Sequence, residues 1–272
     1  MQLVNVVRRH PIVSFFVLAY AISWGALPFE SVRFLPSGPF FAALIVIHIA
    51  WGRAGMREFG SRRIRWRVRW YWYAIALGLP LAVHAAYVGL NVAGGEDFPS
   101  LTFNSLTTFL VLFAVRLVNP ADGPLGEHPG WNGVALPGLQ SSRSPLASAS
   151  ILGVLVAGWH LPTFFLEDGG LQTSVLVAGL VTTVAVTFWY TWLFNHTRGS
   201  ILLVVAAHSV EGSIQYELGF LIMSIWVAVA VALVVFDREA WRGRAPDEAT
   251  MPPTLPLGGK AAPTPPPAAV AR

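Results

Sequence analysis

The chain has 272 residues, of which 54% are hydrophobic and only 12% are charged, whereas about 25% of the residues of an ordinary soluble domain are charged. Together with a mean hydropathy of +0.58, this composition excludes an ordinary soluble domain and predicts a membrane protein. The sequence has no cysteine, which excludes disulfides, thiolate nucleophiles and cysteine-based metal sites. A lipid surface explains the net charge of +4 better than nucleic acid does. We therefore expect the lipid bilayer as a partner and no nucleic acid.

Eight apolar stretches are long enough, or nearly long enough, to cross the roughly 30 Å hydrocarbon core of a bilayer. In chain order they cover residues 11–30, 36–52, 70–93, 101–118, 147–166, 171–194, 200–216 and 218–236. The first run follows Arg8 and Arg9 and is too long for the core of a signal peptide, so it predicts a retained span. The predicted fold is an all-α, polytopic membrane bundle of about eight transmembrane helices.

Positive charges are distributed unevenly among the predicted loops. The segment 52–70 contains seven arginines, and further arginines lie near the N-terminus and after the last predicted span. The loops "GGEDFP", "LEDGG" and "QYELG" carry acidic residues and neither Lys nor Arg. Because cytoplasmic loops carry the excess of Lys and Arg, the pattern predicts a multi-pass protein of the cell membrane with both termini in the cytoplasm.

The composition changes near residue 243. Residues 1–240 predict a single transmembrane domain, with a motif core at about 120–215. Residues 243–272 are rich in Pro and Ala and cannot bury an apolar core. They predict a disordered cytoplasmic tail.

Ionisable residues in and beside the predicted spans are the candidates for chemistry, because such groups are costly in a bilayer and usually functional. Glu127 precedes the fifth predicted span, His160 lies within it, and His208 lies within the seventh. A carboxylate and histidines from separate helices form a general acid–base set. Two structural interpretations stay open: Glu127 as a carboxylate at a helix start, and the histidines as hydrogen-bond partners of neighbouring helices.

A metal site is a further alternative, since imidazole and carboxylate are ligands that zinc accepts. His208 and Glu211 are three residues apart and share a helix face. The ligand set would be His160, His208 and Glu211, with His128 as an alternative to Glu211. The segment carrying Glu127, "GPLGEHPGWNGVALPGLQ", itself predicts a short amphipathic helix on the cytoplasmic side of the membrane.

Three segments resemble the motifs of the CAAX prenyl protease type 2 and bacteriocin-processing (CPBP) family of intramembrane proteases. "GPLGEHPGWNGVALPGLQ" is similar to the first motif, Glu-Glu-x-x-x-Arg with its Gly-, Trp- and Pro-containing flanks. "VLVAGWHLPTFF" is similar to the second, Phe-x-x-x-His followed by Leu-Pro. "TRGSILLVVAAHSVEGS" is similar to the third, which ends in His-x-x-x-Asn. Order and spacing agree, and the family has eight spans.

The resemblance implies a glutamate-type intramembrane endopeptidase that hydrolyses peptide bonds of membrane-associated peptides or proteins. By position, Glu127 would activate water, His160 would be its partner, and His208 would polarise the scissile carbonyl or stabilise the oxyanion. No cofactor is implied, which leaves zinc as the alternative stated above.

The supporting positions depart from the family pattern. The second Glu is His128, the Arg is Asn132, the Phe is Val156, and the Asn of the third motif is Gly212, beside Glu211. The first two changes resemble a paired replacement. The departures motivate a second hypothesis, a non-catalytic family member that acts as a membrane binding or scaffold protein. A third hypothesis is a transporter or channel in which the same residues relay protons or bind an ion.

Overall fold

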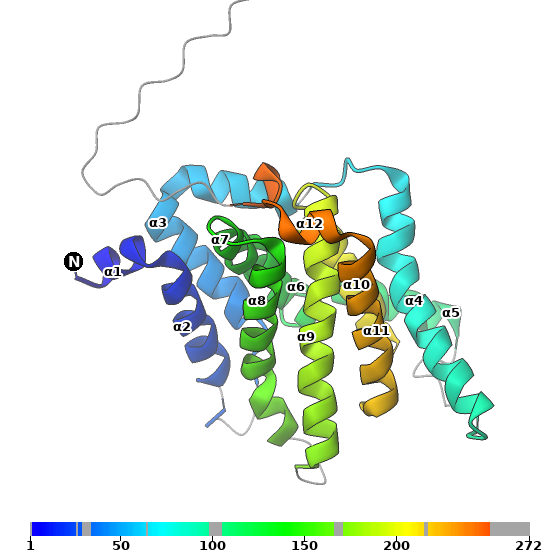
Figure 1. Cartoon of the computed structure of the whole chain (residues 1–272). Coiled ribbons are helices and arrows are strands. Elements are labelled where there is room, and N and C mark those ends of the chain that lie inside the picture. The colour runs from blue at the N-terminus through cyan, green and yellow to red at the C-terminus, as the bar shows by residue number, and fades with distance from the viewer. Residues whose placement is uncertain are drawn as a thin grey trace, which may run out of the picture.

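The computed structural model describes residues 2–25, 27–28, 34–63, 65–97, 105–165, 171–214 and 217–250. All regular secondary structure in these ranges is helical, as predicted, and they contain no strand. The helices form one bundle, in which most of the long helices run side by side (Figure 1).

The longer helices are α2 (Pro11–Trp24), α3 (Gly38–Arg63), α4 (Trp70–Ala93), α5 (Leu106–Val118), α8 (Pro145–His160), α9 (Thr173–His196), α10 (Ile201–Ser213) and α11 (Phe220–Phe236). The shorter ones are α1 (Gln2–Arg9), α6 (Gly123–Gly130), the π-helical turn η1 (Trp131–Ala135), α7 (Leu136–Gln140), the 3-10 turns Leu161–Phe165 and Asp247–Ala249, and α12 (Arg238–Arg242).

The predicted count of eight spans is not confirmed. Five helical segments among the described residues are long and apolar enough to cross a membrane, or six if α1 and α2, which meet at 112°, form one span. Three predicted spans account for the difference. The helices α10 and α11 have only 13 and 17 residues, and 13 residues span only about 20 Å at 1.5 Å per residue. The first predicted span contains α2, which has 14 residues and is bent against α1. The predicted fourth span remains one of the five, in a run of 35 residues, Leu106–Gln140, that includes the Glu127 segment.

The second predicted span ends where α3 bends. Gly52 has φ 58° and ψ −147°, a backbone conformation that favours glycine. The basic part of α3 beyond this bend lies across one end of the bundle (Figure 1). Ser200 donates a hydrogen bond to the Arg65 carbonyl at the same end (2.7 Å). Arg8 donates one to the Ile49 carbonyl (3.1 Å). Basic residues from distant parts of the chain therefore gather at one end.

The described part of the chain extends beyond the predicted start of the tail. Residues 243–250 are described, and Ala249 is fully buried. The Gln140 side-chain amide donates to the Ala249 carbonyl (2.9 Å) and exchanges hydrogen bonds with Asn195. The remainder of the predicted tail, 251–272, lies outside the described residues.

The prediction of an amphipathic interfacial helix at Glu127 is wrong in one respect. The segment is helical, but every residue from Gly126 to Gln140 except Gly138 is buried. Its polar and small residues therefore face protein on all sides. Glycines allow this close approach: a Cβ at Gly126 would lie 2.9 Å from the Pro120 carbonyl oxygen, and one at Gly133 would lie 2.8 Å from the Phe59 ring.

Among these glycines, Gly130 lies closest to the backbone of another segment. Its replacement should therefore lower the stability of the protein. A Cβ there would lie 2.5 Å from the carbonyl oxygen of Pro39 and 2.7 Å from its carbonyl carbon. We expect Gly130→Ala to destabilise the protein by about 1–3 kcal/mol or more, because backbone must move. The measurement is the thermal unfolding midpoint of detergent-solubilised protein, followed by tryptophan fluorescence.

The matched control is Gly89→Ala on α4, where a new Cβ meets nothing within 4 Å. Since alanine is the better helix former by about 0.8–1 kcal/mol, this variant should unfold at or above the wild-type midpoint. Equal midpoints for Gly130→Ala and Gly89→Ala would contradict the packing described.

Candidate functional site

All seven residues proposed for the site line one cavity of about 560 Å³. Three parts of the bundle supply them: Glu127 and His128 lie on α6 and Asn132 on η1, His160 lies at the end of α8, and His208, Glu211 and Gly212 lie on α10. The rest of the wall is supplied mainly by α9. The volume is in the range of about 300–1,000 Å³ typical of sites for small molecules or peptide side chains.

Glu127 is held within the bundle by the start of α6. Asp122 caps this helix, because its carboxylate accepts a hydrogen bond from the Gly123 N–H (2.8 Å). Pro124 follows in the first turn, where a missing N–H costs no helical hydrogen bond. Glu127 comes one turn later and is 7% exposed. Its Oε2 lies 4.0 Å from His160 Nε2.

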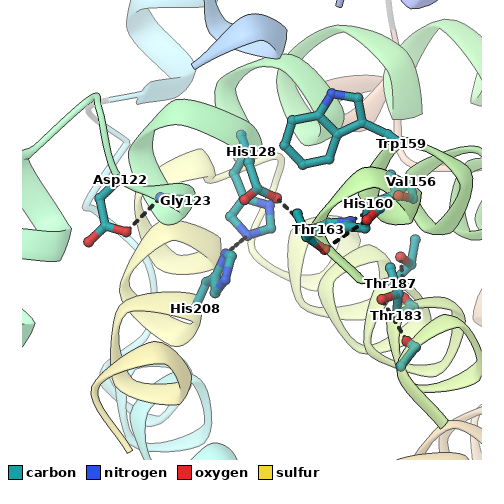
Figure 2. Close-up of polar contacts among 12 residues, drawn as sticks. Asp122, Gly123, His128, Val156, Trp159, His160, Thr163, Thr183, Thr187 and His208 are labelled. Carbon is teal, nitrogen blue, oxygen red and sulfur yellow. Dashed lines mark hydrogen bonds and ion pairs between the residues drawn. The ribbon is translucent and has the colours of Figure 1, made fainter. Parts of the chain in front are cut away.

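His160 is oriented by its own helix. Its Nδ1 lies 2.9 Å from the Val156 carbonyl oxygen, four residues earlier on α8. A carbonyl can only accept, so Nδ1 carries the proton and Nε2 of the neutral ring is an acceptor directed toward Glu127. The Trp159 ring packs edge-on against the imidazole, with centroids 4.7 Å apart. Figure 2 shows His160 facing the region between α6 and α10.

The two departures in the first motif are in direct contact. His128 Nδ1 lies 2.7 Å from Asn132 Oδ1. On its other side, His128 Nε2 lies 2.8 Å from His208 Nδ1, the contact drawn in Figure 2. His128 and Asn132 are both buried, with exposures of 3% and 2%. The paired replacement predicted from the sequence therefore forms a hydrogen-bonded pair, and it extends to the histidine of α10.

Glu211 lies in the same cavity but has a different partner. Tyr190 on α9 donates a hydrogen bond from its hydroxyl to Glu211 Oε2 (2.5 Å). No three His, Asp or Glu side chains among the described residues are grouped to hold a metal ion. The alternative zinc set of His160, His208 and Glu211 is therefore not assembled: each of these side chains has its hydrogen-bond partner elsewhere.

Two residues of the site were missed by reasoning from the sequence. Arg116 near the end of α5 lines the cavity, and its Nη1 lies 3.1 Å from Asp122 Oδ1. An arginine inside a predicted span was the signal, because such a charge is expensive in a bilayer. Tyr190 had no comparable signal, since tyrosines are common in membrane helices.

The fold and the cavity define a class: an all-helical membrane protein with a buried carboxylate and histidines from separate helices around one internal space. Comparisons with known proteins narrow this class. Residues 106–212 match the family model described as "Type II CAAX prenyl endopeptidase Rce1-like". The matched segment contains all seven predicted site residues. Residues 106–212 are thus similar to a family of CAAX-type proteases, as the motifs predicted. No curated protein matches it in sequence.

Proposed function

We propose that the chain is an intramembrane endopeptidase that hydrolyses peptide bonds of membrane-associated peptides or proteins. The observation that carries this proposal is the position of Glu127 Oε2 at 4.0 Å from His160 Nε2, inside a cavity that His208 also lines. The match of residues 106–212 to a model of a protease family supports the same reaction class.

The geometry supports a role for Glu127 as general base on water. A distance of 4.0 Å is too long for a hydrogen bond, but both atoms can accept one from the same water molecule. One water proton then passes to Glu127 while the oxygen attacks the carbonyl carbon, and the carbonyl π electrons move to its oxygen. Glu127 returns the proton to the amide nitrogen as the C=O bond re-forms and the C–N bond breaks. His160 holds the second hydrogen of the water.

His208 is suited to bind the carbonyl oxygen if its Nε2 carries a proton. With Asn132 Oδ1 facing His128 Nδ1, His128 Nδ1 donates, His128 Nε2 accepts from His208 Nδ1, and His208 Nε2 of the neutral ring has no proton. If the Asn132 amide is turned by half a turn about its last side-chain bond, all three hydrogen bonds reverse and His208 Nε2 carries the proton. We infer that the orientation of the Asn132 amide, acting through His128, sets the tautomer of His208, which makes His128 and Asn132 a positioning pair.

The orientation of the chain follows from its charge. The basic residues of α1, of the bent part of α3 and of the 198–200 turn lie at one end of the bundle. We propose that this end faces the cytoplasm, with both termini, by the positive-inside rule. The proposed substrate is a membrane-embedded or membrane-anchored segment that reaches the cavity between the helices.

The proposal is tested with purified, detergent-solubilised protein and a library of synthetic apolar peptides, with and without a C-terminal prenylcysteine. Mass spectrometry should detect fragment pairs whose masses sum to the intact peptide plus one water. Folded protein that yields no such pair from any peptide would contradict the proposal. It would favour the second candidate, a non-catalytic binding or scaffold protein, for which the missing side chain at Gly212 is the specific observation.

A prediction concerns His128. We expect His128→Leu to lower kcat on a cleaved library peptide by about 10-fold, less than the about 10²–10³-fold cost of losing an oxyanion donor outright. The reason is that His208 loses the partner of its Nδ1 and populates both tautomers.

His128→Gln serves as the rescue variant for this experiment. Its side-chain amide can hydrogen bond to both neighbours, so it should recover part of the lost kcat. Since the thermal midpoints of both variants are measured as well, a general loss of folding is distinguished from a change at His208. Equal kcat for wild type and His128→Leu would contradict the positioning role.

A further inference from the structure

We propose that Arg116 is a further catalytic residue: its guanidinium donates a hydrogen bond to the carbonyl oxygen of the bond being hydrolysed. This inference rests on the proposed function and adds a group that the motifs do not contain. Arg116 is the only Lys or Arg among the described residues that line the cavity.

The guanidinium lies beside α10, one turn beyond His208. Residues 208 and 212 are four apart and therefore share a helix face. A Cβ built on Gly212 would lie 2.9 Å from Arg116 Nη1 and 3.3 Å from its Cζ. Arg116 thus takes the space that a side chain at 212 would need. The family pattern has an amide-bearing residue at this position, so the cation replaces an amide donor.

Asp122 fixes the guanidinium relative to the proposed base. Its Oδ1 lies 3.1 Å from Arg116 Nη1 and also accepts from the Gly123 N–H at the start of α6. A Cβ on Gly123 would lie 2.8 Å from Glu127 Oε1 and 3.5 Å from His208 Cε1. The start of α6 therefore lies against both Glu127 and His208, and Arg116 is held at that point.

The guanidinium has donors to spare. It carries five N–H groups. One of its nitrogens, Nη1, donates a hydrogen bond to Asp122. Its Nε is buried and has no hydrogen-bond partner among the described residues. The side chain is 24% exposed, and its surroundings in the cavity include Ile214 and Leu218. In such a poorly solvated site, a fixed cationic donor stabilises the negative charge that develops on the carbonyl oxygen more than it would in water. No proton is transferred from Arg116 in this step.

The test moves the hydrogen-bond donor from position 116 to position 212. On a library peptide that wild type cleaves, Arg116→Ala should lower kcat by about 10²–10³-fold with little change in KM. Gly212→Asn alone should also lower kcat, because the new side chain meets the guanidinium. In the double variant, Arg116→Ala with Gly212→Asn, the space is free and an amide is available. Its kcat should exceed that of Arg116→Ala by about 10-fold or more.

Asp122→Asn is the control for a purely structural role. It keeps the helix-capping acceptor but removes the ion pair, and we expect it to lose less kcat than Arg116→Ala. If Arg116→Ala does not fold, Arg116→Lys keeps the charge without the planar fork, and its kcat should fall between those of wild type and an uncharged variant.

Three results would overturn the inference: unchanged kcat in the Arg116 variants, a change confined to KM, or no recovery in the double variant. If wild type and Glu127→Gln both fail to cleave every peptide, the proposed function fails and the inference falls with it. If wild type cleaves and Glu127→Gln does not, the proposed function stands, whatever the Arg116 series shows.

Discussion

Replacement of Glu127 by glutamine is expected to lower kcat by about 10²–10⁴-fold on any peptide that the wild type cleaves, the range for loss of a general base. Glutamine has nearly the same shape and remains able to fill the space that Glu127 occupies at 7% exposure, but it cannot accept a proton from water. The measurement is single-turnover cleavage by purified protein, followed by mass spectrometry of both fragments.

The matched control for this variant is Glu239→Gln. Glu239 lies on α12, is exposed and does not line the cavity. The kcat of Glu239→Gln should equal that of wild type, and its thermal midpoint should lie within a degree or so of wild type, because surface changes are usually within about 0.5 kcal/mol. If the Glu127→Gln protein cleaves at the wild-type rate, Glu127 is not the general base of the reaction.

The second large effect is expected for His160→Phe. The ring keeps its contact with Trp159 but loses the Nε2 acceptor that faces Glu127 at 4.0 Å. Because a misplaced reactant can cost about 10²-fold, we expect kcat to fall by about that factor or more. KM should change little, since the lost interaction is with water rather than with the peptide. Initial rates over a range of peptide concentrations separate the two constants.

His84→Phe is the control for the same chemical change elsewhere. His84 lies on α4 and does not line the cavity, and its ring nitrogens have no hydrogen-bond partner within the described residues. Its replacement should leave kcat unchanged and leave stability unchanged or slightly higher. Similar losses in both His→Phe variants would point to general damage to the bundle and contradict the specific role of His160.

The sequence predicted the class of fold well and its span count poorly. Apolar runs predict helices because length and hydropathy are local properties. They do not reveal where a helix ends early, as α10 does after 13 residues. They also did not reveal that the Glu127 segment is buried on all faces. That property depends on glycines meeting backbone that is distant in the sequence, as Gly130 does with Pro39.

The sequence predicted which residues form the candidate site but not the hydrogen bonds between them. Glu127, His160 and His208 were selected because ionisable side chains in apolar helices are unusual, and the structure brings all three to one cavity. The hydrogen bonds of His128 and of Tyr190 could not be predicted, because they join helices whose packing the sequence does not specify. The role of Gly212 became visible only with Arg116 beside it.

The central claim is that the chain cleaves membrane peptides through Glu127, and a comparison of peptide N-termini tests it most directly. Membranes from cells that carry wild type or Glu127→Ala, at equal protein abundance, are analysed by mass spectrometry of all N-termini. Termini present with wild type and absent with Glu127→Ala are the predicted result, and they would also identify substrates. Identical sets of termini from two folded, equally abundant proteins would contradict the account.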